Sequence, residues 1–319
     1  MSDGKKRILV CGATGFIGRN IAEYYAAQDD CEVIGTYLKS EPYECENLKL
    51  VKVDLRNADE VDAIVRDVDV IIQAAATTSG ASDIVNRPYI HVTDNAVMNA
   101  LIFRSAFDRG VKHVIFFSCT VMYQPSEAPV KETDFDANNE LLPNYFGVGW
   151  TKIYTEKMCE FYSRLETTKY TVLRHSNVYG PHDKFDLERS HVFGATMTKV
   201  LKAEDGRITV WGTGEEGRDL IYISDIVDFV RAAEKQQTTP FELVNVGLGR
   251  STSIKELVNK VIEASGKEIT VELDTSKPSI KYSFALDTSK AKQLFGWEPK
   301  VSLEDGIEKT MNWYKENLL

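Results

Sequence analysis

In the first half of this chain, short apolar runs rich in β-branched residues alternate with stretches of helical periodicity. The expected strands span residues 7–12, 32–37, 48–55, 68–75, 113–119 and 170–176. The helical stretches between them lie near residues 15–28, 58–66, 93–109 and 148–165. Continuous apolar strands separated by helices indicate a parallel sheet that is covered on both faces. The alternation therefore predicts an α/β fold with a doubly wound parallel sheet of the Rossmann type.

The pattern loosens after about residue 176. The elements expected there are a strand at 207–212, a helix at 224–235, a strand near 242–246 and helices at 253–265 and 302–317. A length of 319 residues favours two domains of roughly 150 residues each. We expect a nucleotide-binding domain in residues 1–175, with a return segment near 219–245. A smaller α/β substrate-binding domain is expected mainly in residues 176–319, over the carboxyl edge of the sheet.

Composition excludes several classes of protein. Lys and Arg number 38 against 48 Asp and Glu, and this formal charge of -10 argues against a nucleic-acid partner. No apolar run reaches the ~18 residues that a membrane span requires, and no signal-peptide cleavage site follows the basic start. The five cysteines are odd in number and lack CxxC spacing, which indicates reduced thiols instead of disulfides or a metal site. We expect a cytoplasmic protein that binds neither a membrane nor a metal ion.

A glycine-rich turn, GATGFIG, joins the first expected strand to the first helix. Gly12, Gly15 and Gly18 have the spacing GxxGxxG. In a dinucleotide-binding turn the first glycine makes the turn, the second lets the backbone approach a pyrophosphate, and the third allows close packing of helix on strand. Thr14, Phe16 and Ile17 belong to the same turn. The alternative is an ordinary strand-to-helix turn, but the position near the N-terminus favours an NAD(P) cofactor.

The ribose end of this expected cofactor site lacks an acid. An NAD-binding unit carries Asp or Glu about 20 residues after the glycines, whereas the segment GTYLKS (35–40) has none. Thr36, Lys39 and Ser40 are candidates to receive a 2′-phosphate instead. This favours NADP(H), with NAD(H) as the alternative.

Two further segments complete the expected cofactor site. Asp54 and Leu55 close the third expected strand and are placed to meet the adenine. The alanine run Ala74, Ala75 and Ala76 offers small side chains where the backbone must approach the cofactor closely.

Motifs along nearly the whole chain carry a family resemblance. They are GATGFIG (12–18), DL (54–55), AAA (74–76), Asn95, FSCTVMY (117–123), WTK (150–152), RHSNVYGP (174–181), WGTGEEGRDLIYISD (211–225), NVG (245–247) and LDTSKAKQLFGWEP (286–299). Through them the chain resembles the extended short-chain dehydrogenase/reductase family of NAD(P)-dependent nucleotide-sugar epimerases, dehydratases and reductases. One segment, YGPHDKFDLERSHV (179–192), is most similar to the GDP-L-fucose synthase branch. The resemblance places Asn95 in the cofactor site.

The resemblance also implies a Tyr–Lys pair spaced YxxxK on a helix, whose tyrosine moves a proton while hydride moves. Lys152 fits the lysine, but Val148 stands where the tyrosine is expected. The resemblance also implies a Ser or Thr that binds the sugar oxygen to which the tyrosine moves its proton. Here Cys119, a weak hydrogen-bond donor, stands in its place. Its neighbours Ser118 and Thr120 are alternative hydroxyl donors.

Three interpretations of the missing tyrosine remain open. Tyr145 lies seven residues before Lys152, roughly on the same helix face, and is a candidate for a displaced acid, although a packing role in the loop is the simpler explanation. In the second interpretation the protein epimerises its substrate through other groups. In the third it binds ligand without catalysis.

A histidine supports the second interpretation. His191 aligns with the residue that, in the fucose-synthase branch, moves protons at carbons beside the keto group, and an ordinary histidine pKa near ~6.5 suits this task. That branch pairs the histidine with a cysteine at the position of Val121, two residues after Cys119. A shift at the strand end would bring Cys119 into this role, whereas a small buried hydrophobe is the alternative.

Other residues match positions for the substrate. Asn177 and Arg218 resemble residues that bind its diphosphate, and Lys199 falls where the branch has a basic residue. Trp211 is a candidate to border the nucleotide base. The helices near 93–109 and 148–165 resemble those that form a four-helix homodimer interface in relatives.

The leading hypothesis is an NADP(H)-dependent epimerase or 4-keto reductase, or both, acting on a GDP-linked 4-keto-6-deoxy hexose. A nucleotide-sugar 4,6-dehydratase or C4 epimerase is the alternative among enzymes. A silent module that binds a dinucleotide or sugar nucleotide is the alternative from another class.

Overall fold

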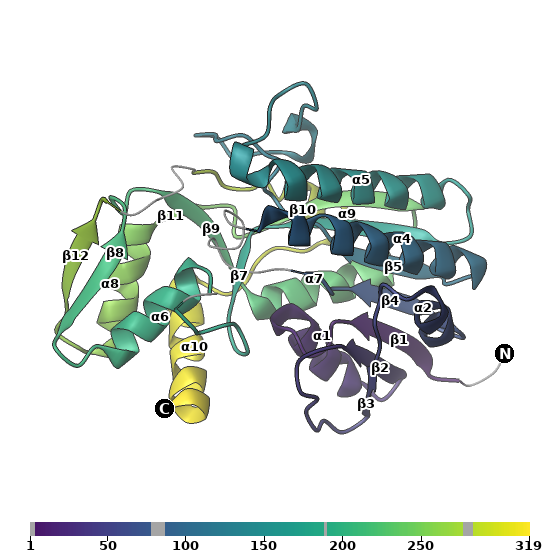
Figure 1. Ribbon diagram of the computed structural model, residues 1–319, viewed down its shortest axis with the longest axis horizontal. Coiled ribbons are helices and arrows are strands. Elements are labelled where there is room, and N and C mark those ends of the chain that lie inside the picture. Colours follow the sequence, from purple (N-terminus) through teal and green to yellow (C-terminus); the bar gives the residue numbers. More distant parts are fainter. Residues whose placement is uncertain (1–3, 78–86, 188–189, 277–282) are drawn as a thin grey trace.

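The computed structural model describes residues 4–77, 87–187, 190–276 and 283–319. Seven parallel strands form its central sheet, in the order β10-β6-β5-β4-β1-β2-β3 (Figure 1). They are β1 (Lys6–Cys11), β2 (Cys31–Tyr37), β3 (Leu48–Lys52), β4 (Val70–Gln73), β5 (His113–Phe117), β6 (Lys169–His175) and β10 (Phe241–Val246). The strand order reverses between β1 and β4, which is where sheets of this kind bind ligands. The predicted Rossmann-type fold is confirmed.

Helices cover both faces of the sheet, as Figure 1 shows. One face packs on α1 (Phe16–Ala26) and α7 (Ile223–Gln236). The other packs on α2 (Ala58–Val65), α4 (Thr93–Asp108) and α5 (Phe146–Ser163). Adjacent residues of one strand serve opposite faces, because Val10 belongs to the first core and Leu9 to the second. Both faces are apolar, which explains why the strands were recognisable as continuous hydrophobic runs.

Most of the later elements lie beside the sheet in a second lobe (Figure 1). A three-stranded sheet contains β7 (Asn177–Tyr179), β9 (Gly217–Tyr222) and β11 (Ser251–Ser253), and β8 (Arg207–Trp211) pairs with β12 (Thr270–Asp274). The later helices are α6 (Val192–Lys202), α8 (Ile254–Ser265), α9 (Ser289–Phe295) and α10 (Leu303–Leu318), and 3-10 turns are η1 (Pro88–His91), η2 (Glu132–Asp134) and η3 (Pro143–Tyr145). Residues of α6, α8 and α10 share one continuous core with the α1/α7 face.

Several boundaries differ from the sequence expectations. The third, fourth and fifth strands end at Lys52, Gln73 and Phe117, two or three residues before their predicted ends. The chain leaves the sheet at these points, so the motif residues that follow lie in loops at its carboxyl edge. Helix α6 was not expected. It contains Gly194, which packs so tightly that an added Cβ would lie 2.4 Å from the Lys184 carbonyl oxygen. This is a tertiary contact that local periodicity does not encode.

The structure also bears on membrane spans and on the cysteines. Among the helices in the described part, none is long and apolar enough to cross a membrane. All five cysteines are free thiols.

Candidate functional site

The glycine-rich turn and the alanine run meet at the point where the strand order reverses. Gly12 has a φ of +78°, and a Cβ on it would lie 2.8 Å from the Cα atom of Ala75. A Cβ on Gly18 would lie 2.2 Å from the carbonyl oxygen of Gly12. Gly12 thus makes a turn that L side chains rarely adopt, and Gly18 lets α1 pack against β1. Small residues are required in both motifs because the two loops touch.

The N-terminus of α1 offers amide groups to an anion. Its N-cap, Gly15, has an extended backbone and no capping side chain, and the first turn holds no acidic residue. Thr14, Phe16 and Ile17 lie around it, Phe16 and Ile17 half-buried. First-turn N–H groups without internal partners, together with the positive end of the helix dipole, suit a diphosphate. The residues present therefore fit the expected dinucleotide.

Thr36 does not lie where a 2′-phosphate ligand was expected. Its side chain is buried, and its hydroxyl oxygen accepts a 3.1 Å hydrogen bond from the Gly12 amide. Its carbonyl oxygen accepts a 2.8 Å bond from the Ala13 amide. Thr36 therefore holds the glycine turn through two hydrogen bonds to its backbone. Lys39 and Ser40 are exposed beyond the end of β2.

Asp54 and Leu55 follow β3 instead of closing it. Arg56 binds the Asp54 carboxylate through Nε at 2.9 Å and Nη2 at 2.8 Å, and also donates to Asp94. Hydrogen bonds from Arg56 lower the pKa of Asp54 to about 2. Leu55 is buried. Asp54 is thus a fixed carboxylate near the edge of the sheet.

Asn95 acts on the loop that follows β4. Its side-chain oxygen accepts a 2.8 Å bond from the Thr77 amide, and its Nδ2 donates to the Thr77 carbonyl at 3.0 Å. The side chain is buried, so it holds the end of the alanine run in place. Residues 78–86, which come next, lie outside the described residues.

Lys152 projects from α5 to the end of β5. Its Nζ donates a 2.7 Å hydrogen bond to the Phe117 carbonyl oxygen and lies 4.8 Å from the centroid of the Phe116 ring. Burial lowers the pKa of the ammonium group, while the Cys119 and Glu156 charges oppose this shift. Val148, one turn earlier, presents a half-buried apolar side chain.

The three residues after β5 have different surroundings. Ser118 is buried and donates a 2.5 Å hydrogen bond to Oε1 of Glu156, so its hydroxyl is used within the protein and not to hold a substrate oxygen as expected. Cys119 is half-buried; burial raises its thiol pKa and the Lys152 charge lowers it. The carbonyl of Thr120 accepts a 3.1 Å hydrogen bond from the Tyr123 amide, which closes a turn over residues 120–123.

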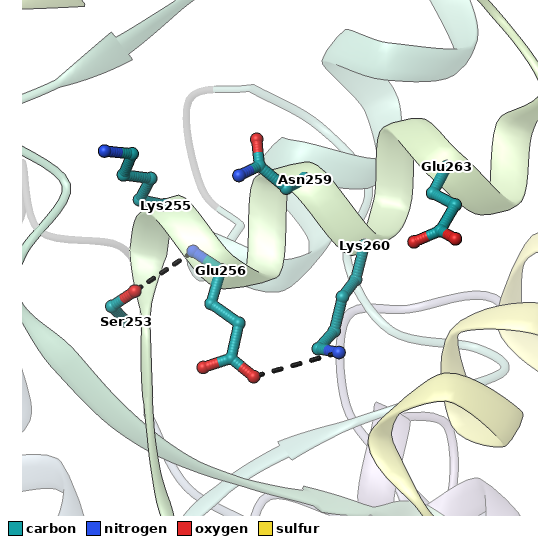
Figure 2. A pocket seen from close by; sticks show the side chains of 6 residues that line it. All are labelled: Ser253, Lys255, Glu256, Asn259, Lys260 and Glu263. Atoms are coloured by element: carbon teal, nitrogen blue, oxygen red, sulfur yellow. Dashed lines mark hydrogen bonds and ion pairs between the residues drawn. The ribbon is translucent and has the colours of Figure 1, made fainter.

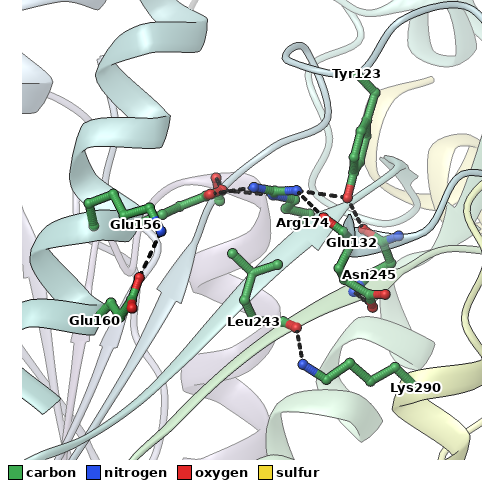
Figure 3. A network of polar contacts seen from close by, with 10 residues as sticks. Tyr123, Glu132, Glu156, Glu160, Arg174, Leu243, Asn245 and Lys290 are labelled. Carbon is green, nitrogen blue, oxygen red and sulfur yellow. Dashed lines mark hydrogen bonds and ion pairs between the residues drawn. The ribbon is translucent and has the colours of Figure 1, made fainter. Parts of the chain in front are cut away.

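A buried polar network joins α5 to the strands β6 and β10 (Figure 3). Arg174 donates to both Glu156 carboxylate oxygens, at 3.0 and 2.7 Å, and to the Tyr123 hydroxyl at 2.9 Å. Tyr123 in turn donates to Asn245 on β10 at 2.7 Å. Glu156 lies one helical turn after Lys152, so this network fixes α5 against β6 and β10.

Tyr145 faces the second lobe. It is half-buried at the start of α5, and its phenol pKa is raised by burial, lowered by the Arg218 charge and raised by that of Cys119. Arg218 donates a 2.7 Å bond to the Gly217 carbonyl, and Asn177 Nδ2 a 3.3 Å bond to the Asp219 carbonyl. Asn177 and Arg218 lie on paired strands, β7 and β9. Expected substrate residues thus lie near the expected catalytic ones.

The remaining candidates lie around α6. His191 is its N-cap and is exposed to solvent on one side. Partial burial of the ring and then the Lys184 charge lower its imidazole pKa. Lys199 donates a 2.7 Å bond to the Thr209 carbonyl and lies 5.9 Å from the ring centroid of Trp211, which is 53% exposed. In the segment 179–192, which resembles the GDP-L-fucose synthase branch, residues 188 and 189 lie outside the described residues.

Sequence reasoning missed His175. It ends β6, and burial lowers its imidazole pKa to about 4; the charges of Lys152 and His191 contribute to this shift, whereas a hydrogen bond to Ser176 opposes it. Its position inside RHSNVYGP, beside Arg174, was the signal available in the sequence. His175 therefore belongs to the same cluster as the predicted catalytic residues.

A hollow along α8 lies outside this cluster (Figure 2). Its lining side chains come from one polar helix face, where Ser253 accepts a 3.0 Å bond from the Glu256 amide and Lys260 pairs with Glu256 at 3.8 Å. These contacts stabilise the helix itself. Across the described ranges, no three His, Cys, Asp or Glu residues gather as metal ligands would.

Comparison with known proteins adds independent findings. The family model described as "NAD dependent epimerase/dehydratase family" matches residues 8–247. The GDP-L-fucose synthase of Azorhizobium caulinodans is 31% identical, over 98% of this chain and 97% of its own length. The GDP-L-colitose synthase of Yersinia pseudotuberculosis is 28% identical, over 97% of each chain. The structure of UDP-glucose 4-epimerase from Thermotoga maritima with UDP-glucose superposes with a TM-score of 0.87 at 26% identity, covering 98% of this chain and 100% of that one.

Proposed function

The chain belongs to the NAD-dependent epimerase/dehydratase family, and we propose that it is an NADP(H)-dependent enzyme that epimerises or reduces, or both, a GDP-linked 4-keto-6-deoxy hexose. Its relatives are NAD(P)-dependent epimerases and reductases of nucleotide sugars, so the chain is an enzyme of this kind. The GDP-linked substrate is supported by the GDP-L-fucose and GDP-L-colitose synthases among those relatives.

The observation that carries the proposal is a convergence at the carboxyl edge of the sheet. The charges of Lys152 and His191 act on one imidazole, and that of Lys152 also acts on the Cys119 thiol. These groups come from α5, the start of α6 and the loop after β5. Charged and titratable groups gathered at such an edge are typical of a catalytic site.

The cofactor would be held by the glycine turn, the alanine run and Lys152. When bound, its nicotinamide supplies or receives a hydride. Lys152 would orient the nicotinamide ribose and place a positive charge beside the reacting oxygen. His191 and Cys119 would move protons at the carbons beside the keto group, and Tyr145 is a further candidate for proton transfer at the oxygen.

The substrate diphosphate would be held by Asn177 and Arg218, whose strands pair directly. Lys199 and Trp211 lie together on the same lobe and would receive the nucleotide end. We expect this lobe to act as the substrate-binding domain, with the boundary near residue 176.

The preference for NADP(H) depends on Lys39. With Thr36 occupied beneath the glycine turn, Lys39 and Ser40 are the predicted ligands that stay exposed at the end of β2. We expect Lys39→Ala to weaken NADPH binding by about tenfold, through one lost charge-assisted contact, and to leave NADH binding unchanged. Lys49→Ala, an exposed lysine on β3, is the matched control. Fluorescence titration of both cofactors makes the measurement.

A homodimer is part of the proposal. The outer surfaces of α4 and α5 expose Val97, Tyr154 and Phe161, the last two each 57% exposed. Large apolar side chains of this kind on two packed helices suit a symmetric interface. Light scattering after size-exclusion chromatography should give twice 35.9 kDa. The five free thiols support a cytoplasmic location.

The proposed function is tested by absorbance at 340 nm. Purified protein, first freed of bound cofactor, is mixed with NADPH and then with NADH while a GDP-4-keto-6-deoxy hexose is added. Loss of absorbance with NADPH is the expected result. Unchanged absorbance, together with no epimerised sugar by NMR, would contradict the proposal.

A further inference from the structure

His175 lies at the carboxyl edge of the sheet, where Lys152 binds the end of β5. Leu173 pairs with Phe117, the last residue of β5, so His175 extends two residues beyond the end of that strand. Its ring centroid is 5.8 Å from that of Phe117. The Phe117 carbonyl oxygen accepts the Lys152 ammonium at 2.7 Å. The imidazole and the ammonium group therefore flank the same residue at the carboxyl edge of the sheet.

The hydrogen bonding of His175 determines its tautomer. Its Nδ1 lies 2.8 Å from the carbonyl oxygen of Ser176. A carbonyl oxygen only accepts, so Nδ1 carries the hydrogen and Nε2 of the neutral ring keeps its lone pair. Within the described ranges Nε2 has no hydrogen-bond partner. It is a proton acceptor that the fold does not use.

The charges around His175 and Tyr145 distinguish the two groups. Burial, followed by the charges of Lys152 on α5 and His191 at the start of α6, lowers the pKa of His175 to about 4, although its hydrogen bond to Ser176 opposes this shift, so the ring is neutral at pH 7. Burial raises the pKa of Tyr145, and the charges that act on it are those of Arg218 and Cys119. Of the two groups, His175 is thus the one on which the Lys152 charge acts directly.

We propose that Nε2 of His175 exchanges the proton of the sugar oxygen at the carbon that undergoes hydride transfer, replacing the tyrosine that position 148 lacks. This inference rests on the proposed function. In oxidation, the carbon loses a hydride to the oxidised nicotinamide cofactor while its hydroxyl proton passes to Nε2. In a net reduction, Nε2 first takes a proton from water and then gives that proton to the oxygen as the hydride reaches the carbon. One proton from water is used for each sugar that is reduced.

The test compares His175→Asn with His182→Asn. In the first variant the side-chain amide nitrogen replaces Nδ1 and keeps a donor for the Ser176 carbonyl, whereas Nε2 is lost. The control, His182, belongs to a loop outside the cluster, where its φ of +68° suits asparagine. We expect His175→Asn to slow single-turnover hydride transfer at 340 nm by ~10²–10⁴-fold, and His182→Asn to keep the wild-type rate. NADPH binding, followed by fluorescence, should be unchanged in both.

Histidine NMR gives a readout independent of turnover. With Cε1-labelled histidine the protein has five signals, and the signal of His175 is the one absent from the His175→Asn variant. We expect this signal to titrate below the ordinary histidine range and to change position when the GDP-sugar product and NADP+ bind together. A histidine outside the ligand site would keep the same signal with and without these ligands, and an unchanged signal would count against the inference.

The outcomes separate the inference from the function on which it rests. An active wild type together with an equally active His175→Asn variant overturns the inference alone. A wild type inactive on GDP-, UDP- and dTDP-linked 4-keto sugars overturns the proposed function. If His175→Asn unfolds, a second set of variants decides. Val148→Tyr is introduced into the wild type and into His175→Gln, and hydride transfer is measured in each. Restored transfer in the double variant supports the inference, and no restoration overturns it.

Discussion

The Lys152 ammonium donates a 2.7 Å hydrogen bond to the Phe117 carbonyl oxygen. This contact joins the middle of α5 to the end of β5 and places a positive charge at the carboxyl edge of the sheet. The adjacent buried pair of Glu156 and Arg174 holds the same helix against β6. The lysine is therefore fixed in position before any ligand binds, which lowers the cost of ordering the site.

Removing the Lys152 charge should slow hydride transfer. Lys152→Met keeps much of the apolar stem over Phe116 but loses the ammonium group. We expect ~10²-fold or slower single-turnover reduction and weaker NADPH binding. Lys157→Met, on the same helix with a side chain 72% exposed, should retain wild-type rates. Equal rates in the two variants would refute the role of Lys152.

His191 should govern proton exchange at the sugar carbon. His191→Asn keeps a good N-cap for α6 while removing the imidazole, so the helix should persist. We expect solvent deuterium to enter the 4-keto sugar at least ~10²-fold more slowly, as followed by NMR. Deuterium entry at the wild-type rate would show that another group moves this proton.

Lys184 should set the pH dependence of that exchange. Its charge lowers the pKa of His191, so Lys184→Gln should raise this pKa towards the ordinary histidine value. A base with a higher pKa loses its proton at higher pH. The acidic limb of the pH–exchange profile should therefore move to higher pH in Lys184→Gln. A profile that stays fixed, or moves to lower pH, would contradict the assignment of His191 as the base.

Breaking the buried ion pair should destabilise the fold strongly. Arg174 and Glu156 are each 4% exposed, so Arg174→Met leaves a carboxylate in the core without its cation. Such losses cost ~3–5 kcal/mol, whereas replacing both partners by apolar residues is far less costly. Denaturant unfolding of Arg174→Met and of Arg174→Met/Glu156→Met tests this. A double variant no more stable than the single one would contradict the explanation.

Asp183 should make stability fall as pH rises. Burial raises its pKa to about 7, and Oδ2 has no hydrogen-bond partner in the described part of the chain. Between about pH 4 and pH 7 the folded protein keeps a proton on Asp183 that the unfolded chain has released. The stability of the fold therefore falls as pH rises through this range and stays lower above it. Asp183→Asn should be more stable than wild type above pH 7, by up to roughly 4 kcal/mol.

The comparison needs a surface control. Asp29→Asn alters an exposed residue in the turn before β2, and its free energy of unfolding should stay within about 0.5 kcal/mol of the wild type. Denaturant melts at pH 5 and pH 8 give both values. An Asp183→Asn variant with the same difference from wild type at the two pH values would refute the titration of Asp183.

Much of the architecture was predictable because its signals are local. Apolar runs and helical periodicity identified the strands and helices of the central sheet, and Gly12 and Gly18 marked a turn whose φ and packing only glycine satisfies. The second lobe was less predictable. Its strands β7 and β11 are three residues long, too short for a recognisable pattern, and they form only by pairing with β9.

The sequence by itself determined the fold class, the nucleotide-binding turn and the absence of tyrosine at position 148. The tertiary structure alone decided which polar groups are already used and which are not. Thr36 and Ser118 are polar in sequence, yet the Gly12 amide and Glu156 occupy their hydroxyls. His175 stands inside the motif RHSNVYGP, but only the register of β6 beside β5 places it at the strand end where the Lys152 charge acts on its imidazole. Local periodicity records which face a residue occupies, whereas partners distant in sequence are set by strand register and packing.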